Sequence, residues 1–549
     1  MALRLITGRS GQGKTEYLVQ EVIRLSMENP QQKYYVIVPE QFSLEMQRKM
    51  VKKHPRHGFF NIDVLSFHRL AYRIFDECGY QPGEILEDLG VSMMLRKILS
   101  EGENNFLYFK KSMKKAGFID ELKSMLMEFI GYGVTWEQVE EVSEKLGENK
   151  ALSNKCKELG RIYEHFDKAI EGRFMVTEQI LDVAREFAKE APMLTNAVFY
   201  FDGFAGFTPV QLAFLKELLK VARQINVTIT IPEFVPGQRG MPEDLFTSSK
   251  KTGDALLMLC QENMQEVEEV VKLDTPVSPR FINNPELAFL EKNLFQNSRK
   301  IYSKKIERIH MTVCHNPDGE ADYVMHKIEQ LVRQKGYRYR DFAVLSGDVA
   351  DYASAFKRKA AILNIPVFED TKKKVSYHSG VEAVRSLFHL AQMEYSYESV
   401  FRYLKSGMSN LIDEDADYLE NYVLYAGVRG YSMWKKPFYR RLKNKDEAAI
   451  KALLLLQEKF MEETENFCSV MRDKEASVRD KIEVLYHTMV KLSFEEKLKN
   501  QAQKAEENSD FVKAAEYRQL YDLLLSLMDK IVMIFGEEKM AVKELAEIV

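Results

Sequence analysis

Close to its N-terminus the sequence reads Gly8-Arg9-Ser10-Gly11-Gln12-Gly13-Lys14-Thr15, which matches the phosphate-binding pattern GxxxxGKS/T in full. In such a loop the glycines let consecutive backbone N–H groups point at phosphate oxygens, and the start of the following helix adds favourable partial charge. We expect all eight residues to bind the phosphates of ATP or a closely related nucleotide. Lys14 is expected to reach the β- and γ-phosphates, and the Thr15 hydroxyl to bind Mg²⁺.

Short apolar runs alternate with helical patterns around this loop. Residues 3–6 lead into it, a helix is expected from about Lys14, and residues 34–38 and 62–65 are two further apolar runs. Strands that alternate with helices are typical of βα units on a parallel sheet. The sequence therefore predicts an α/β fold of the P-loop NTPase type.

Helical patterning interrupts this sheet. Residues from about 89 to 190 are helical in pattern throughout, and strand patterning returns at 197–201 and 227–231. A helical insertion into one parallel sheet explains this return better than two unrelated domains. The expected boundaries are 1–88 and 191–300 for the α/β domain and 89–190 for the insertion.

A second α/β unit is expected after a polar segment, residues 273–305, that contains three prolines and is interpreted as a linker. Its predicted strands are residues 309–313 and 341–345, the latter the clearest buried strand. The chain is helical in pattern from about 395 onward and stops without a helix stop signal. The expected boundaries are 306–395 for the start of this unit and 396–549 for a second, truncated helical insertion.

An acidic residue, Asp202, ends the apolar run 198–201, which is the form of a Walker B segment. Such an aspartate holds Mg²⁺ from the strand beside the phosphate loop. We therefore expect Thr15 and Asp202 to be the metal-binding pair. The next residue is Gly203, where a motor ATPase usually carries a glutamate that polarises the attacking water. This absence predicts slow hydrolysis, and no catalytic residue is assigned.

Further polar and aromatic residues follow the predicted strands, at the edge where open α/β sheets bind ligands. An exposed aromatic such as Phe67, two residues from Arg69, suits stacking on bases and contact with phosphates of single-stranded nucleic acid. The alternative, equally open on the sequence, is that Phe67 is a core residue and Arg69 a surface residue at a helix start. The candidate DNA-binding residues in these segments are Gln41, Ser43, Phe67 and Arg69.

The composition is that of a soluble globular protein. The chain has 549 residues, of which 45% are hydrophobic and 29% charged, with a formal net charge of −4, so any nucleic-acid groove must be locally basic. No apolar run of about eighteen residues predicts a membrane helix, and no signal peptide is expected. The five cysteines are scattered and form no CxxC pair, which argues against disulfides or a zinc site and fits a cytoplasmic protein.

Five segments in order carry a family resemblance: GRSGQGKT (8–15), VIVPEQFSLEM (36–46), VLSFHRLAYRIF (64–75), FYFDGFAGFTPVQ (199–211) and RYRDFAVLSGD (338–348). They resemble the N-terminal portion of the B subunits of AddAB-type helicase–nucleases, the AddB/RexB family, which is related to superfamily 1 helicases. The resemblance is distinctive over roughly the first 400 residues. The helical remainder fits the family's inserted domain by position and general character only.

This resemblance implies a superfamily 1 helicase-like fold, with parallel sheets and large all-helical insertions. It implies a partner, the A subunit, which carries the motor, and a role in processing double-stranded DNA breaks for recombination. It also implies recognition of the Chi sequence in single-stranded DNA. No association with a membrane is expected. Phe207, on the loop after Asp202, would join the DNA-binding edge. The family's nuclease domain and iron–sulfur cysteines lie far toward its C-terminus, and this chain offers no candidate for either.

Departures from motor helicases predict little motor activity. Besides Gly203, the residues Ser346-Gly347-Asp348 stand where a motor would place a nucleotide-facing arginine. Two other readings remain open: a P-loop kinase acting on a small molecule, or a scaffold subunit with a vestigial nucleotide site.

Overall fold

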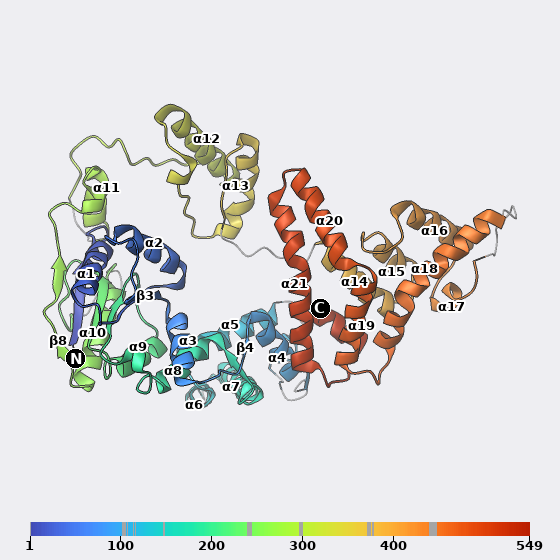
Figure 1. Cartoon of the computed structure of the whole chain (residues 1–549), viewed down its shortest axis with the longest axis horizontal. Coiled ribbons are helices and arrows are strands. Elements are labelled where there is room, and N and C mark those ends of the chain that lie inside the picture. Colours follow the sequence, from blue (N-terminus) through green and yellow to red (C-terminus); the bar gives the residue numbers. More distant parts are fainter. Residues whose placement is uncertain are drawn as a thin grey trace. The chain divides into compact units, whose positions relative to one another are not determined.

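A computed structural model describes residues 2–549 except 102–105, 107, 114, 116, 147–148, 239–243, 296–299, 370–374, 376–377 and 439–446. The chain divides into two compact units, Met1–His310 and Met311–Val549 (Figure 1). Each unit is described by itself.

The first unit is built on a parallel sheet with the strand order β3-β2-β6-β7-β1-β8, and β9 also pairs with β1. Its strands are β1 (Ala2–Gly8), β2 (Tyr34–Ile37), β3 (Ile62–Leu65), β6 (Val198–Phe201), β7 (Gln224–Thr230), β8 (Glu266–Val267) and β9 (Val271–Leu273). Every pairing within the sheet is parallel, so the C-terminal ends of all the strands share one edge. The predicted α/β fold with a parallel sheet is confirmed.

Helices cover both faces of this sheet, which is why β2 and β6 are buried along their whole length. On β2, Tyr34 and Val36 face a core formed with α1 (Lys14–Glu28) and α2 (Ser43–Lys53). Tyr35 and Ile37 face the opposite core. The helices of that second core are α3 (Phe67–Cys78), α8 (Ile180–Glu186), α9 (Pro209–Leu218) and α10 (Thr247–Glu262).

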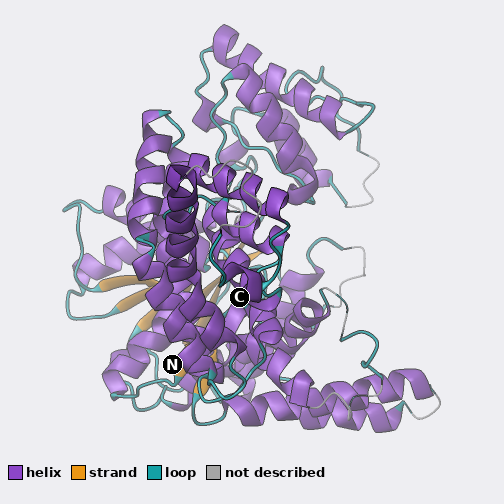
Figure 2. Cartoon of the chain, turned by 90° about the vertical axis from the view of Figure 1, so that its right-hand side faces the viewer, coloured by secondary structure: helices purple, strands orange, loops and turns teal. Residues whose placement is uncertain are grey.

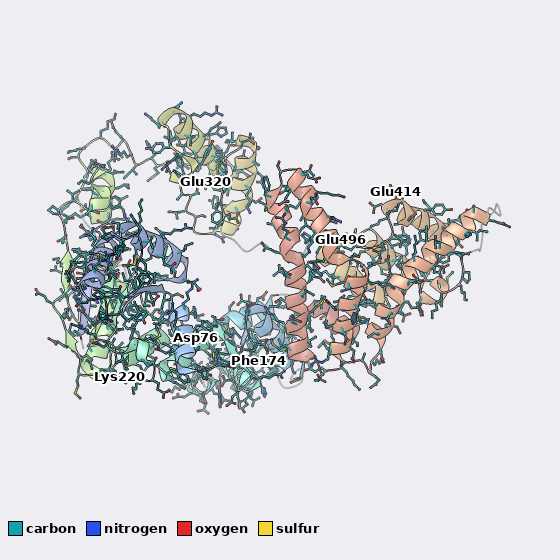
Figure 3. All side chains as sticks on the ribbon, viewed as in Figure 1. Asp76, Phe174, Lys220, Glu320, Glu414 and Glu496 are labelled. Carbon is teal, nitrogen blue, oxygen red and sulfur yellow. The ribbon has the colours of Figure 1, made fainter. Side chains whose placement is uncertain are left out.

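The inserted region consists mainly of α4 (Asp88–Glu101), α5 (Phe118–Gly131), α6 (Trp136–Lys145) and α7 (Lys150–Ile170). It differs from the expected uninterrupted helix pattern at one place. A short parallel pair, β4 (Glu84–Leu86) with β5 (Phe174–Val176), joins its two ends (Figure 3 labels Phe174). Strands of three residues are too short to show a period, so the sequence pattern missed β5. After it, Ile180, Leu181 and Ala184 of α8 already belong to the core of the sheet.

The second unit is built from helices and the loops that connect them, and its described residues form no strand (Figure 2, helices in purple). Its helices are α12 (Pro317–Lys335), α13 (Val349–Leu363), α14 (Ser379–Gln392), α15 (Tyr397–Leu404), α16 (Asp413–Ala426), α17 (Tyr431–Trp434), α18 (Glu447–Arg472), α19 (Val478–Lys491), α20 (Phe494–Glu507), α21 (Phe511–Phe535) and α22 (Val542–Ile548). The hydroxyl of Tyr352 on α13 donates to Glu320 on α12 at 2.6 Å (Figure 3 labels Glu320). Among the described residues, no helix is both long and apolar enough to cross a bilayer.

The two strands predicted for a second α/β unit are not strands in this structure. Residues 309–313 and 341–345 have no regular structure apart from a 3₁₀ turn at Tyr339–Asp341, and Met311 and Leu345 are each 95% exposed. An apolar run becomes a buried strand only when a neighbouring strand pairs with it, and neither segment pairs with a strand in the described part of the chain. The interpretation of residues 306–395 as the start of a second helicase-like domain stays a prediction.

A buried polar network ties α1, the helix that follows the phosphate loop, to the sheet. Glu21 forms an ion pair with Arg4 of β1 and accepts a hydrogen bond from the Tyr200 hydroxyl of β6 at 3.0 Å. Arg4 Nε donates to the Asn226 side-chain oxygen of β7 at 2.7 Å. The side chains of Arg4 and Glu21 are only 15% and 10% exposed. Because α1 begins at the loop, this network also fixes the loop on the sheet.

Glu21→Ala is therefore expected to lower the free energy of unfolding by about 3 kcal/mol, because it removes the short-range ion-pair partner of half-buried Arg4, which keeps only Glu268 at 3.9 Å, and takes the acceptor from the Tyr200 hydroxyl. The measurement is thermal unfolding followed by circular dichroism. Glu28→Ala, on the same helix, removes an exposed i,i+4 partner of Arg24 and is the matched control, expected to change little. Equal melting temperatures for the two variants would contradict the prediction.

Candidate nucleotide site and the adjoining sheet edge

The phosphate loop has the backbone that its glycines predict. Gly11 and Gly13 have φ angles of 80° and 89°, in the left-handed region that side chains with a Cβ rarely adopt. Gly13 directly precedes α1, and no side chain of the described residues caps this helix start. The first-turn N–H groups are therefore free to bind an anion, as a phosphate site requires.

Lys14 lies folded within the loop. Its ammonium donates to the backbone oxygens of Gly8 at 2.8 Å and Arg9 at 3.0 Å. Burial, aided by the positive charge of Arg280, lowers the pKa of Lys14 to about 8, although Asp202 and Glu291 act in the opposite direction. In this state the Lys14 ammonium is hydrogen-bonded to two neutral backbone carbonyls. A bound phosphate would compensate its positive charge directly.

The predicted metal pair is brought together. The Thr15 hydroxyl donates to one carboxylate oxygen of Asp202 at 2.7 Å, and the Thr228 hydroxyl donates to the other at 2.7 Å. Asp202 is 5% exposed. A hydroxyl and a carboxylate are oxygen ligands of the kind that Mg²⁺ takes beside water and substrate phosphates, so the donor set fits this ion. Thr228 could not be predicted as part of this site, because a threonine inside a strand has no motif that marks it.

Gly203 follows Asp202 with a φ of 82°. A residue with a side chain would be strained in this conformation. The position therefore supplies no carboxylate for activating water, and its backbone disfavours one.

The ends of β3, β2 and β6 lie side by side in the sheet, so the segments that follow them share one edge. Gln41 is exposed in a 3₁₀ turn (Glu40–Phe42) directly after β2. Arg69 is exposed in the first turn of α3, and its backbone N–H donates to the N-cap hydroxyl of Ser66 at 3.3 Å. Ser43, by contrast, is 4% exposed.

Phe67 is a core residue, as the alternative reading proposed, and the expectation of an exposed ring is wrong. It is 6% exposed. Its ring packs against those of Phe201, Phe204, Phe207 and Phe214, with centroids 5.4 to 6.3 Å apart. The first residue of α3 points down the apolar face of that helix, toward the sheet, and this burial cannot be read from its place after a strand. Phe207 is half-buried in the same cluster.

One aromatic at this edge was missed. Phe42, between Gln41 and Ser43, is 44% exposed. The signal that could have found it was its position in a turn that follows Pro39 at the end of a strand. That the five candidate residues contact DNA stays a prediction.

The low pKa of Lys14 makes nucleotide binding depend on pH. Because a bound phosphate keeps Lys14 charged, Mg·ATP binding should take up about 0.5 proton at pH 8, where half of the free protein is deprotonated at Lys14. The affinity should fall about tenfold from pH 7 to pH 9. Calorimetry in two buffers of different ionisation enthalpy measures the uptake, which should nearly vanish at pH 6.5. An affinity that stays constant from pH 7 to 9 would contradict the assigned pKa.

The sequence profile of the family described as "ADDB, N-terminal" matches residues 5–291, more than half of the chain. Three similar proteins are each named as the B subunit of an ATP-dependent helicase/deoxyribonuclease. Those from Lachnoclostridium phytofermentans and Thermoanaerobacter pseudethanolicus are 32% identical over 100% and 98% of this chain, and 48% and 47% of their own lengths. That from Clostridium botulinum strain Hall is 30% identical over 100% of this chain and 48% of its own length.

The chain thus spans about half the length of the curated relatives it matches. The profile match includes the phosphate loop, Asp202 and the sheet edge beside them. This match, which contains four of the five segments, and the similar proteins, which align with nearly the whole chain, confirm the predicted resemblance. The chain belongs to the AddB family, whose N-terminal region it matches.

Proposed function

We propose that this chain binds ATP with Mg²⁺ and single-stranded DNA, as part of the B subunit of a heterodimeric helicase–deoxyribonuclease. The observation that carries the proposal is one shared edge of the sheet. The phosphate loop, the Thr15–Asp202 pair and the exposed residues after β2 and β3 all lie at C-terminal strand ends, where open α/β sheets bind ligands. The relatives' names, which describe one subunit of a helicase and deoxyribonuclease, support DNA as the substrate and a second subunit as the partner.

In this proposal residues 8–15 hold the nucleotide phosphates, and Thr15 and Asp202 hold Mg²⁺. The ion, when bound, neutralises phosphate charge. Lys14 would exchange its two carbonyl partners for phosphate oxygens. With glycine at 203 no side chain there orients water, so the site uses nucleotide mainly as a bound ligand, and the A subunit supplies the motor.

Single-stranded DNA would cross the edge formed by the segments after β2, β3 and β6. Gln41 and Arg69 are exposed there, and Phe42 offers a ring face for a base. The intact cytoplasmic heterodimer would process double-stranded DNA ends for recombination, and this edge would read Chi in the passing strand. The nuclease domain and the iron–sulfur cluster would belong to parts of the family's chains outside this one.

The test combines calorimetry with Mg·ATP and fluorescence anisotropy with labelled single-stranded oligonucleotides. Binding of both supports the proposal, and stronger binding of Chi than of scrambled oligonucleotides by the heterodimer supports its finer part. Phosphate transfer to small acceptors without DNA binding would favour a kinase instead. Failure to bind nucleotide, with DNA binding intact, would favour a scaffold with a vestigial site.

A further inference from the structure

The segment after β9 lies directly against the phosphate loop. We call residues 274–281 the strap. The Gln12 side chain of the loop makes three hydrogen bonds with Thr275: its nitrogen donates to the Thr275 carbonyl at 3.2 Å, and its oxygen accepts from the Thr275 N–H at 3.1 Å and hydroxyl at 2.6 Å. The N–H of Arg280 donates to the Gly11 carbonyl at 3.4 Å. The segment interpreted as a linker is therefore attached to the predicted nucleotide site.

The strap packs so closely against the phosphate loop that Gly11 is required for a second reason, in addition to its positive φ angle. A Cβ added to Gly11 would lie 2.6 Å from the Ser278 hydroxyl and 2.9 Å from the Arg280 Cβ. A Cβ added to Gly8 would lie 2.8 Å from the carbonyl oxygen of Leu273, the last residue of β9, which directly precedes the strap. Cβ atoms essentially never approach other atoms this closely, so the neighbouring residues would have to shift. Glycines here serve the packing of the strap as well as the turn of the loop.

Two strap side chains at this contact lack partners among the described residues. Ser278 is only 6% exposed, yet its hydroxyl, next to Gly11, makes no hydrogen bond within the described part of the chain. Leaving a buried hydroxyl unpaired costs roughly 1–3 kcal/mol, so a native protein rarely does so without a use for the group. Arg280 is exposed, and its guanidinium has no hydrogen-bond or ion-pair partner in the ranges that the structure describes.

Arg280 also lies near enough to Lys14 for the two positive charges to repel each other, which contributes to the lowered pKa of Lys14. The carboxylates of Asp202 and Glu291 act on Lys14 in the opposite direction, so they offset part of this repulsion. A polyphosphate removes this repulsion, and an arginine binds phosphate through two parallel N–H groups.

We propose that the strap is the second wall of the nucleotide site, with the Arg280 guanidinium and the Ser278 hydroxyl binding the terminal phosphate of a nucleoside triphosphate held by the phosphate loop. This inference rests on the proposed nucleotide binding. In this proposal Arg280 of the strap and Lys14 of the loop are two positive side chains that bind the same polyphosphate. It makes the site selective for triphosphate over diphosphate.

The test is calorimetry of the full chain with Mg·ATP and with Mg·ADP. Arg280→Ala should weaken Mg·ATP binding at least tenfold and Mg·ADP binding less than twofold, because only ATP carries the terminal phosphate. Arg280→Lys should recover part of the affinity, and Ser278→Ala should lose a few-fold for ATP only. Lys272→Ala is the matched control: it removes an exposed cation of β9 that pairs with Glu233 at 3.2 Å, and should change neither affinity.

The outcomes separate this inference from the proposed function. Unchanged ATP affinity in Arg280→Ala, or equal losses for ATP and ADP, would overturn the role of the strap even while Lys14→Ala abolishes binding of both. If Lys14→Ala also leaves both affinities unchanged, the phosphate loop itself is not the nucleotide site, and the proposed function fails first.

Discussion

Lys14→Ala is expected to reduce the affinity for Mg·ATP at least about a hundredfold while the fold stays intact. A charged hydrogen bond contributes roughly 1.5–3 kcal/mol, and two such bonds to phosphate amount to about 3 kcal/mol, or two factors of ten. Without nucleotide, Lys14 donates to two loop carbonyls and carries a charge that burial disfavours. Its removal should therefore cost the free protein little stability.

The measurement is calorimetry with Mg·ATP on the variant and the wild type, with thermal unfolding as the check of the fold. Lys52→Ala removes an exposed lysine near the end of α2 and controls for the change in net charge. Wild-type affinity in Lys14→Ala would remove the assignment of the loop. A large fall in melting temperature would show that Lys14 serves the fold instead.

The sheet strands near the loop could be predicted because their signals are local. Strands β2 and β3 are mostly apolar between turn residues, and the glycine pattern marks the end of β1. Strands β8 and β9 were missed, since two or three partly exposed residues show no period and join the sheet only by pairing with β1. The prediction of strands needs a local pattern, and an edge strand often has none.

The candidate site also combines contacts that local motifs predict with contacts that they do not. The pairing of Thr15 with Asp202 follows from two motifs, whereas the contribution of Thr228 depends on β7 lying next to β6. The strap was interpreted as a linker because proline and polar residues are typical of linkers. It packs against Gly11, which is far away in the chain, and local composition cannot predict such a contact.

The segments predicted as strands of a second sheet show the reverse error. Residues 341–345 have the composition of a buried strand, yet Val344 is 50% and Leu345 95% exposed. An apolar run indicates that its side chains favour a buried environment. Whether that environment forms depends on pairing partners that lie elsewhere.

Phe67→Ala is expected to lower the free energy of unfolding by about 3–4 kcal/mol, because it removes a ring buried among four other phenylalanines. Any loss of DNA binding in this variant would follow from the damaged edge and not from a lost stacking contact. Thermal unfolding measures the effect. A melting temperature equal to that of the wild type would show that the ring is not held in the core.

Phe42→Ala separates DNA contact from stability at the same edge. Its ring is 44% exposed, so truncation should change the melting temperature little. If single-stranded DNA crosses this edge, the loss of one stacked base should cost about 1–3 kcal/mol, a fall in affinity of roughly five- to a hundredfold. Fluorescence anisotropy with a labelled oligonucleotide measures this affinity.

Phe60→Ala is the matched control: this fully exposed ring precedes β3, at the opposite edge of the sheet, and its removal should not change DNA affinity. Equal losses in the two variants would mean general surface binding, and no loss in either would exclude Phe42 from the path of the strand.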